Sequence, residues 1–180
     1  MTTPLEDIFG IKNCPVLEDL TREELEELRG RTRVRDYDAV NGVVCEENTT
    51  GDGFGILASG QVRVFKLDDK GKEHLLAVLK EGDFFGEMAL LDLELRSASV
   101  HALEPTRVLW IFRQDFEELR QSGSPLVGKL LFRMMTNLSQ RLRLLNERYV
   151  YVRSCYTTGG RGVSRYSERA PSYATLSEDS

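Results

Sequence analysis

Hydrophobic and polar residues recur with a helical period near the start of the chain. In residues 17–30, LEDLTREELEELRG, the leucines are separated by mostly charged residues at helical spacing. Thr21 and Glu24 have the spacing of a capping box, and Gly30 follows soon after the last leucine. The pattern therefore predicts a short helix that ends near Gly30.

From about residue 32 to residue 112, short apolar runs replace the helical period. The runs are GVVCE, FGILASG, QVRVFKL, EHLLAVL, SASVHAL and RVLWIFR, and turn signals such as NG at residue 41, SG at residue 59 and DDKG at residue 68 lie between them. Short strands at such regular spacing, with no long helix between them, are typical of an antiparallel barrel or sandwich. The chain is therefore expected to be mainly β, with flanking helices.

A helical period returns after the predicted strands. Residues 113–121, RQDFEELRQ, predict one helix, SGSP interrupts it, and residues 126–150 predict a single long helix. Along this helix, apolar residues follow the alternating four and three spacing of a coiled-coil seam, which predicts a homodimer. The seam consists of Leu131, Met135, Leu138, Leu142 and Leu145, and continues to Tyr149.

The same apolar stripe has a second interpretation. Leu130 and Met134 widen the apolar face, so the helix is also suited to packing against the predicted strand domain. Both interpretations stay open, and each can hold for a different part of the helix.

The length of 180 residues suits one domain, or one domain with a tail. We expect an N-terminal extension over residues 1–15 and a domain over residues 16–150 that includes the helix at 126–150. Residues 151–180 are rich in Ser, Arg, Gly and Tyr and predict a disordered tail. The tail is interpreted as either a partner-binding or modified segment or an inert extension, and it contains no helix-turn-helix pattern.

Composition and charge narrow the classes of function. The chain is 41% hydrophobic and 29% charged with a formal net charge of -5, which is ordinary for a globular protein and argues against broad nucleic-acid binding. No apolar run approaches the roughly 18 residues of a membrane span, and MTTPLEDIFG lacks the features of a secretory signal. The cysteines, Cys14, Cys45 and Cys155, have no disulfide or zinc spacing, so reduced thiols in a cytoplasm are expected.

The segment GDFFGEMALLDLELRSASV, residues 82–100, carries the clearest candidate chemistry. A helix that begins near Glu87 would direct free backbone amides at an anion, and Gly86 would let a ligand approach the backbone closely. Arg96 offers planar donors suited to phosphate oxygens, and Ser97 adds a hydroxyl. Glu87 suits a neutral hydroxyl such as the ribose 2′-OH, so the set predicts a site for a nucleotide with a compactly held phosphate. The alternative is that Glu87 and Arg96 form a structural ion pair.

An enzyme is not expected from these residues. The two histidines, His74 and His101, lie far apart, so a cupin-like metal site is not indicated and no metal is expected. The chain has no G-x-S-x-G, Walker or Cys/His signal. The single tryptophan, Trp110, is interpreted as a core residue.

The sequence resembles the cyclic-nucleotide-binding domain family, which includes bacterial catabolite activators, the regulatory domains of cAMP- and cGMP-dependent kinases, and cyclic-nucleotide-gated channels. The phosphate-binding cassette of the family follows F-G-E-x-A-L-x(5)-R-[SAT]-A-x-V, and residues 85–100 run FGEMALLDLELRSASV. The upstream blocks NGVVCEENTTGDGFGILASGQVRVFKL and GKEHLLAVLKEGDFFGE are also similar, so the resemblance spans about residues 16–148. It implies an antiparallel, jelly-roll-like β-roll with an N-terminal helix, a short cassette helix and a long C-terminal helix.

The resemblance also implies ligand contacts for matching positions. These are Gly86 and Glu87 for backbone and ribose contacts, Met88 and Ala89 for amides toward the phosphate, Arg96 and Ser97 for its charge and an oxygen, and Val64 and Leu76 for the apolar lining.

The chain departs from the family pattern at three positions. Leu93 and Leu95 stand where the family often has Gly and Pro, so the connection to Arg96 is expected to differ. Asn48 replaces a frequent glycine in a turn, which asparagine tolerates because it adopts left-handed conformations. The residue that caps the base is not identified, and the candidates in the last helix are Arg143, Asn146 and Arg148.

The function that the resemblance implies is a stand-alone cyclic-nucleotide sensor that signals through movement of its C-terminal helix to a dimer or to an unknown effector protein. Ser97 is similar to the residue of bacterial cAMP receptors, whereas Thr there accompanies cGMP acceptance, so cAMP is favoured over cGMP. No DNA-binding segment is expected. The alternative is a scaffold of the same fold that binds no nucleotide and interacts through the long helix and the tail.

Overall fold

The structure is a computed structural model that describes residues 3–38, 42–91 and 94–157, without the side chains of Ala89, Leu91 and residues 154–157. The chain divides into two compact units, Met1–Arg133 and Met134–Ser180, which are considered separately below.

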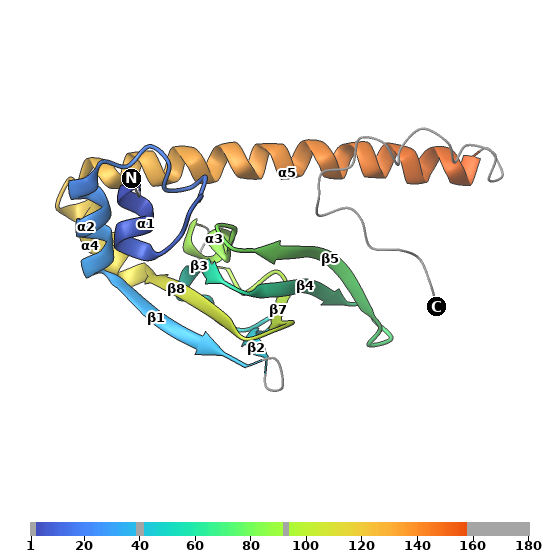
Figure 1. The fold of residues 1–180 in the computed structure, drawn as a ribbon. Helices are drawn as coiled ribbons and strands as arrows, with labels where there is room; N and C mark the ends of the chain where they lie inside the picture. The colour runs from blue at the N-terminus through green and yellow to red at the C-terminus, as the bar shows by residue number, and fades with distance from the viewer. Residues whose placement is uncertain (1–2, 39–41, 92–93, 158–180) are drawn as a thin grey trace. The chain divides into compact units, whose positions relative to one another are not determined.

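Two four-stranded sheets form the centre of the first unit (Figure 1). The first has the order β1 (Thr32–Tyr37), β8 (Thr106–Phe112), β3 (Gly53–Ser59) and β6 (Phe84–Phe85), and the second has the order β2 (Val43–Cys45), β7 (Ser99–Ala102), β4 (Gln61–Leu67) and β5 (Glu73–Lys80). All pairings between these strands are antiparallel. The expected mainly β, antiparallel architecture is therefore confirmed.

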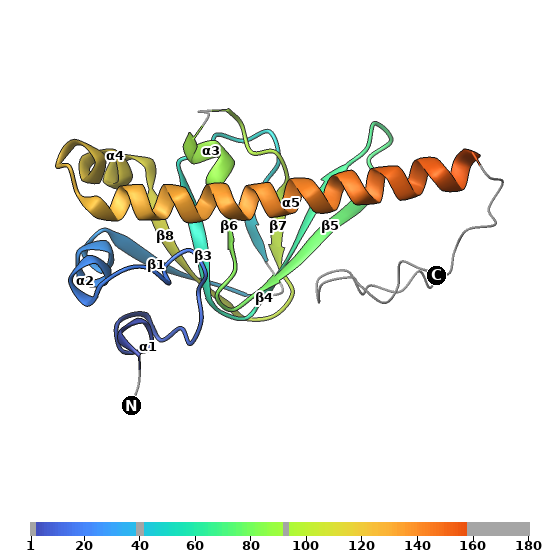
Figure 2. The same cartoon turned by 90° about the horizontal axis from the view of Figure 1, so that it is seen from above.

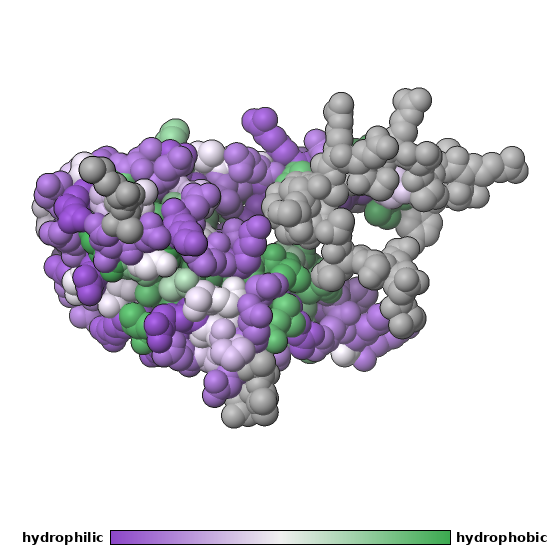
Figure 3. All heavy atoms as spheres, in the orientation of Figure 1, coloured by the Kyte–Doolittle hydropathy of each residue, from purple (hydrophilic) through white to green (hydrophobic). Residues whose placement is uncertain are grey.

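The hydrophobic core lies between the two sheets. It combines Leu57, Phe85, Val108 and Trp110 of the first sheet with Val62, Leu79 and Val100 of the second. Since side chains of both sheets form one buried cluster, the sheets pack face to face and close a β-roll. Trp110 is 4% exposed, as expected for a core residue. In Figure 3, hydrophilic side chains predominate on the visible face, and hydrophobic ones show in several smaller patches.

Helices gather at one end of the sheets (Figures 1 and 2). They are α1 (Pro4–Phe9), α2 (Arg22–Gly30), α4 (Arg113–Gln121) and the first turns of α5 (Pro125–Thr157). The capping box of Thr21 and Glu24 is formed as predicted, since each residue's side chain accepts a hydrogen bond from the other's backbone N–H. The helix begins at Arg22 instead of residue 17 because Cys14 to Leu20 form turns.

Three elements were not predicted from the hydrophobic pattern, although the family resemblance implied a strand before the cassette. In α1, Thr3 accepts a hydrogen bond from the amide of Glu6, Pro4 occupies the first turn, and Gly10 ends the helix in a left-handed conformation. Strand β1 reads TRVRDY, and its charged residues hide the alternation by which strands are recognised. Strand β6 has only two residues.

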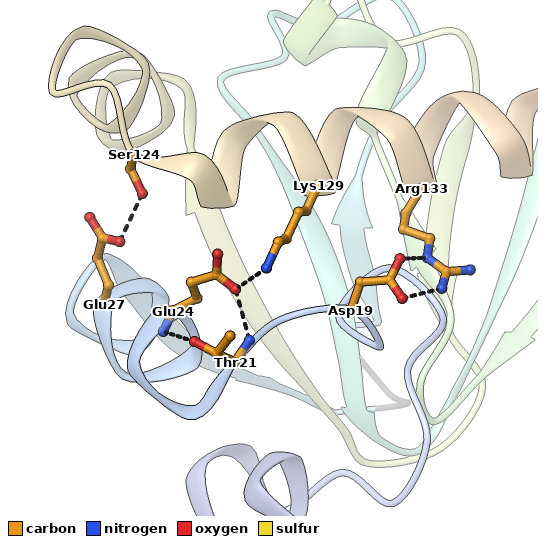
Figure 4. A network of polar contacts seen from close by, with 7 residues as sticks. All are labelled: Asp19, Thr21, Glu24, Glu27, Ser124, Lys129 and Arg133. Atoms are coloured by element: carbon orange, nitrogen blue, oxygen red, sulfur yellow. Dashed lines mark hydrogen bonds and ion pairs between the residues drawn. The ribbon is translucent and has the colours of Figure 1, made fainter.

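Polar contacts join the N-terminal region of the first unit to the start of α5 (Figure 4). Lys129 Nζ donates to Glu24 Oε2 at 2.7 Å, and Ser124 Oγ donates to Glu27 Oε2 at 2.8 Å. Arg133 forms a two-pronged pair with Asp19, at 2.5 and 2.6 Å. The start of α5 is also anchored by Leu126 and Leu130, whose side chains are fully buried.

Helix α5 extends to Thr157, past the expected end at residue 150. No glycine or proline occurs between residue 151 and Thr157, so nothing in this segment interrupts the helix. The rest of the expected tail, residues 158–180, lies outside the described residues.

Exposure differs between the two sides of the apolar stripe on α5. Leu130 and Met134 are buried, and Leu131 and Leu138 are half-buried. The remaining seam residues, with their exposed fractions, are Met135 (61%), Leu142 (58%), Leu145 (58%) and Tyr149 (63%). In the second unit the helix therefore carries an exposed apolar stripe.

Candidate functional site

The segment that follows β6 forms the predicted short helix. Helix α3 spans Glu87–Leu91, directly after Gly86, as the sequence predicts. Gly86 has a φ of 81°, which is the left-handed region that favours glycine. A Cβ on Gly86 would lie 2.1 Å from Nη1 of Arg96, so a side chain cannot fit there without displacing the arginine. Both conformation and space thus require glycine at this position.

Arg96 lies against the first sheet and is 5% exposed. Its Nη2 donates to the carbonyl oxygen of Gly53 at 2.7 Å, and its Nη1 donates to that of Gly86 at 3.3 Å. The guanidinium carbon is 5.6 Å from the centre of the Trp110 ring. These contacts fix the cation beside the N-terminal end of α3.

The backbone of Arg96 is held by a neighbouring turn. Its N–H donates to Thr49 O at 2.8 Å, and its carbonyl accepts from Asn48 N at 2.9 Å. A β-bridge between Thr50 and Leu95 continues this pairing. The turn needs a left-handed residue, and Asn48 has a φ of 61°, which confirms the role expected for the asparagine.

Glu87, Met88 and Ser97 complete this part of the site. Glu87 is 3% exposed at the first position of α3, whereas Met88 is 45% exposed. Ser97 Oγ is exposed and donates to Met88 Sδ at 3.9 Å. The structure therefore brings Gly86, Met88, Arg96 and Ser97 together, with Glu87 adjoining them in the chain.

Three more residues were predicted to bind the ligand: Val64, Leu76 and Ala89. Val64 is half-buried against the core cluster between the sheets. Leu76 is 46% exposed at an irregularity of the β4–β5 pairing, where Val64 pairs with Ala77 and the next pair is Phe65 with Leu75. Ala89 is helical, but its side chain is outside the description. Contacts of Val64 and Leu76 with a ligand stay a prediction.

Two further groups of residues were singled out in the sequence, the connection to Arg96 and the base-capping candidates. Leu93 lies outside the described residues, and Leu95 is 53% exposed. The base-capping candidates Arg143, Asn146 and Arg148 lie on α5 in the second unit, and their role stays a prediction.

The charge of Arg96 acts on its surroundings. Burial raises the pKa of the Cys45 thiol, and the positive charge of Arg96 opposes that rise. Cys45 belongs to β2, which pairs with β7 just after the cassette. The electrostatic influence of Arg96 thus reaches the second sheet, as expected for a cation in a site of low exposure.

Sequence reasoning missed three residues that position Arg96. Gly53 and Trp110 contact its guanidinium, and the hydroxyl oxygen of Tyr37 accepts a hydrogen bond from Trp110 Nε1 at 2.9 Å. They lie on β3, β8 and β1, so only the pairing of these strands brings them together. No local sequence signal could have identified them.

In the part of the chain that the structure describes, no cluster of three His, Cys, Asp or Glu side chains is arranged to hold a metal ion. None of the helices within 3–38, 42–91 and 94–157 combines the length and apolarity needed to cross a membrane.

Comparison with known proteins agrees with this geometry. Residues 39–122 match the sequence model of the cyclic nucleotide-binding domain. These residues belong to the cyclic nucleotide-binding domain family. The resemblance noted from the cassette is thereby confirmed, and so is the β-roll with flanking helices that it implied.

Individual relatives support the same assignment. The cyclic AMP receptor protein of Thermus thermophilus is 35% identical over 133 residues, which cover 74% of this chain and 59% of that protein. A cAMP-dependent protein kinase regulatory subunit of Aspergillus fumigatus is 34% identical over 109 residues, which cover 61% of this chain and 25% of that protein. The crystal structure of a cyclic nucleotide-binding domain from Methylobacillus flagellatus has a TM-score of 0.67 and 26% identity, and the match covers 81% of this chain and 80% of that one. The chain thus spans less than two thirds of the length of the first two relatives.

Proposed function

We propose that this protein is a regulatory sensor that binds a cyclic nucleotide, with cAMP preferred over cGMP. The observation that carries the proposal is the position of Arg96, a nearly buried cation held beside Gly86 and the start of α3. A cation beside the N-terminal end of a helix is suited to an anionic phosphate. The family of the domain supports the choice of a cyclic nucleotide.

Each residue of the cassette has a role in this proposal. Arg96 pairs with the charge of the cyclic phosphate, and the backbone amides of Met88 and Ala89 face its oxygens. Glu87, nearly buried at the first position of α3, accepts a hydrogen bond from the ribose 2′-OH. Gly86 contributes backbone contacts to the ligand, and its missing side chain leaves room for the guanidinium of Arg96. Val64 and Leu76 line the apolar side of the ligand.

The preference for cAMP rests on Ser97. Its hydroxyl lies on the exposed side of the cassette, next to Met88. Serine at this position resembles the bacterial cAMP receptors, and the relative from Thermus thermophilus is named for cyclic AMP.

Signalling is assigned to α5. The helix has two positions, and ligand binding shifts the equilibrium between them by the difference in ligand affinity of the two states. The exposed stripe that includes Met135, Leu142 and Leu145 then serves a homodimer or an effector protein. Amide exchange over residues 126–148, with and without cAMP, tests this step. Unchanged exchange in a protein that binds cAMP would contradict it.

One observation supports a second candidate function, that of a scaffold that binds no nucleotide. Arg96 is only 5% exposed, and its hydrogen bonds already go to the carbonyl oxygens of Gly53 and Gly86. A ligand must therefore reach an arginine that the fold already uses. In the scaffold, Arg96 only stabilises the fold, and α5 binds a partner protein without regulation by a nucleotide.

Calorimetric titration with cAMP and then cGMP distinguishes the two functions. The sensor predicts micromolar or tighter binding of cAMP, lost in Arg96→Ala because an unpaired partner of a buried charge costs roughly 2–5 kcal/mol. Arg29→Ala, which removes an exposed arginine of α2, is the matched control and is expected to bind as wild type. No heat and no thermal shift with either nucleotide, in a folded protein, would favour the scaffold.

A further inference from the structure

Strand β3 has glycines, Gly53 and Gly55, at positions that pair with aromatic residues of β8. Gly53 pairs with Phe112 and Gly55 pairs with Trp110 in the antiparallel register, so the two glycines share a face of the sheet with these aromatic residues. A Cβ on Gly53 would lie 2.4 Å from Ile111 O, and one on Gly55 would lie 2.8 Å from the Phe85 ring. The two glycines let β8 and the Phe85 ring pack closely on β3, and Arg96 contacts Gly53 O and the indole of Trp110 at this place.

The indole of Trp110 is held in a defined orientation. Its Nε1–H donates to the hydroxyl oxygen of Tyr37 at 2.9 Å. Phe85 meets the indole edge to face, with ring centres 5.5 Å apart and an interplanar angle of 88°. Phe112 stacks on the indole, with ring centres 6.2 Å apart and an interplanar angle of 23°. Trp110 is also 4% exposed. A ring fixed on these sides cannot turn away from Arg96 without disturbing the core.

An aromatic ring beside a buried guanidinium has an electrostatic consequence. The negative face of an indole attracts a cation within about 6 Å of the ring centre. The distance from the Arg96 guanidinium carbon to the ring centre, 5.6 Å, is close to that limit, so we expect a cation–π energy in the lower part of the usual range. The two carbonyl oxygens of Gly53 and Gly86 fix the direction of the guanidinium plane, and the indole adds a surface below it that water does not reach.

We propose that Trp110 is a positioning residue for anion binding: its ring, oriented by Tyr37, holds the guanidinium of Arg96 in the place where the ligand phosphate meets it. The part that concerns binding rests on the proposed function of the cassette. Preorganisation of this kind strengthens binding because the arginine loses less freedom when the ligand arrives. Since Trp110 is the single tryptophan of the chain, its emission also reports directly on Arg96.

The first test uses no nucleotide. Tryptophan emission is compared between wild type and Arg96→Met, which removes the charge but keeps an unbranched side chain. The emission maximum or the quantum yield is expected to change in Arg96→Met, and to stay unchanged in Arg29→Ala. Identical spectra of wild type and Arg96→Met would overturn the contact between charge and ring, whether or not the protein binds a nucleotide.

The second test measures the Kd for cAMP in variants of the ring. Trp110→Phe keeps an aromatic ring but loses the bond to Tyr37, and it is expected to raise Kd about 2- to 5-fold, the lower part of the range for a cation–π contact. Trp110→Leu removes the ring and is expected to raise Kd further, toward 30-fold at most. Phe116→Leu is the matched control, because it shortens a buried aromatic side chain that belongs to α4 and not to the sheet that carries Trp110. It is expected to bind as wild type.

Thermal unfolding and circular dichroism of each variant separate positioning from loss of the fold. If Trp110→Leu does not fold, the Kd values of Trp110→Phe and Tyr37→Phe decide instead, because each of these variants keeps an aromatic ring at the substituted position. A Kd in Trp110→Phe equal to or lower than that of wild type would overturn the proposal. If wild type binds no cAMP, the proposed function fails, and the emission comparison alone decides whether Trp110 positions Arg96.

Discussion

Gly86 and Arg96 are in direct contact: the guanidinium occupies the space that a side chain at Gly86 would need, and the Gly86 carbonyl accepts one of its hydrogen bonds. The glycine therefore has two functions in one position. It turns the chain from β6 into α3, and it leaves room for the cation that the cassette brings back nine residues after Glu87. A change that disturbs the turn from β6 into α3 is therefore expected to displace Arg96, and a displaced Arg96 is expected to disturb the turn.

Gly86→Ala tests this double role. The left-handed conformation costs a residue with a Cβ about 1–2 kcal/mol, and the 2.1 Å approach to Arg96 adds to that cost. Gly71→Ala is the matched control, since Gly71 has a φ of 78° with open space around it. Urea unfolding is expected to show a larger loss of stability for Gly86→Ala than for Gly71→Ala. Equal losses would mean that Arg96 moves aside without cost.

Asn48→Ala tests the turn that holds the backbone of Arg96. Asn48 has a φ of 61°, and alanine lacks the side chain that makes this region tolerable for asparagine. We expect a loss of about 1 kcal/mol for Asn48→Ala, and a change of less than about 0.5 kcal/mol for Asn48→Gly. Chemical unfolding measures both. An alanine variant at least as stable as the glycine variant would contradict the assignment.

Lys129→Met tests the anchoring of α5 in the first unit. Glu24 is 8% exposed and accepts hydrogen bonds from Lys129 Nζ and from the Thr21 amide. Removing the cation leaves a buried carboxylate without its charged donor, at a cost of about 1.5–3 kcal/mol. Arg22→Met, which breaks the exposed pair with Asp7, is the control and is expected to cost less than about 1 kcal/mol.

The same pair predicts a pH dependence. Burial raises the pKa of Glu24, but the hydrogen bonds from Lys129 and Thr21 outweigh it, so the pKa is lowered from its ordinary value of 4.5. A lowered pKa adds stability above the unfolded value, and this stability is lost as the pH falls through the folded value. The difference in unfolding free energy between wild type and Lys129→Met is therefore expected to be constant near neutral pH and to shrink below pH 4.5. A difference that does not change with pH would contradict the role of the charge.

Local signals predicted the elements that they determine. Strand β4 and helix α4 have the predicted bounds, Gln61–Leu67 and Arg113–Gln121, and the capping box at Thr21 is formed. In each case neighbouring residues in the sequence decide the structure, through alternation or through capping. The turn at Gly86 and the short helix α3 belong to the same class, because both are determined within one segment of the sequence.

Elements that depend on pairing between distant segments were missed. β1 is a strand because β8 supplies its hydrogen-bond partners, from Thr32 with Ile111 to Tyr37 with Thr106. Trp110 was predicted to be a core residue, yet its contact with Arg96 depends on the pairing of β3 with β8 and on the bond to Tyr37. Such contacts exist only after the sheets have formed, so the sequence pattern does not contain them.

The exposed stripe on α5 leads to a prediction about assembly. Leu142 and Leu145 are each 58% exposed, so replacing both with glutamate is expected to leave the β-roll intact. If the proposed dimer uses the stripe, the charges face their own copies across the seam and repel, and a dimeric wild type becomes monomeric. Analytical ultracentrifugation of wild type and Leu142→Glu/Leu145→Glu measures this, with Gln140→Glu as a control for an added charge at an exposed position of the same helix. A double variant that sediments as the wild-type dimer would place the interface elsewhere, and a monomeric wild type would leave the stripe to an effector protein.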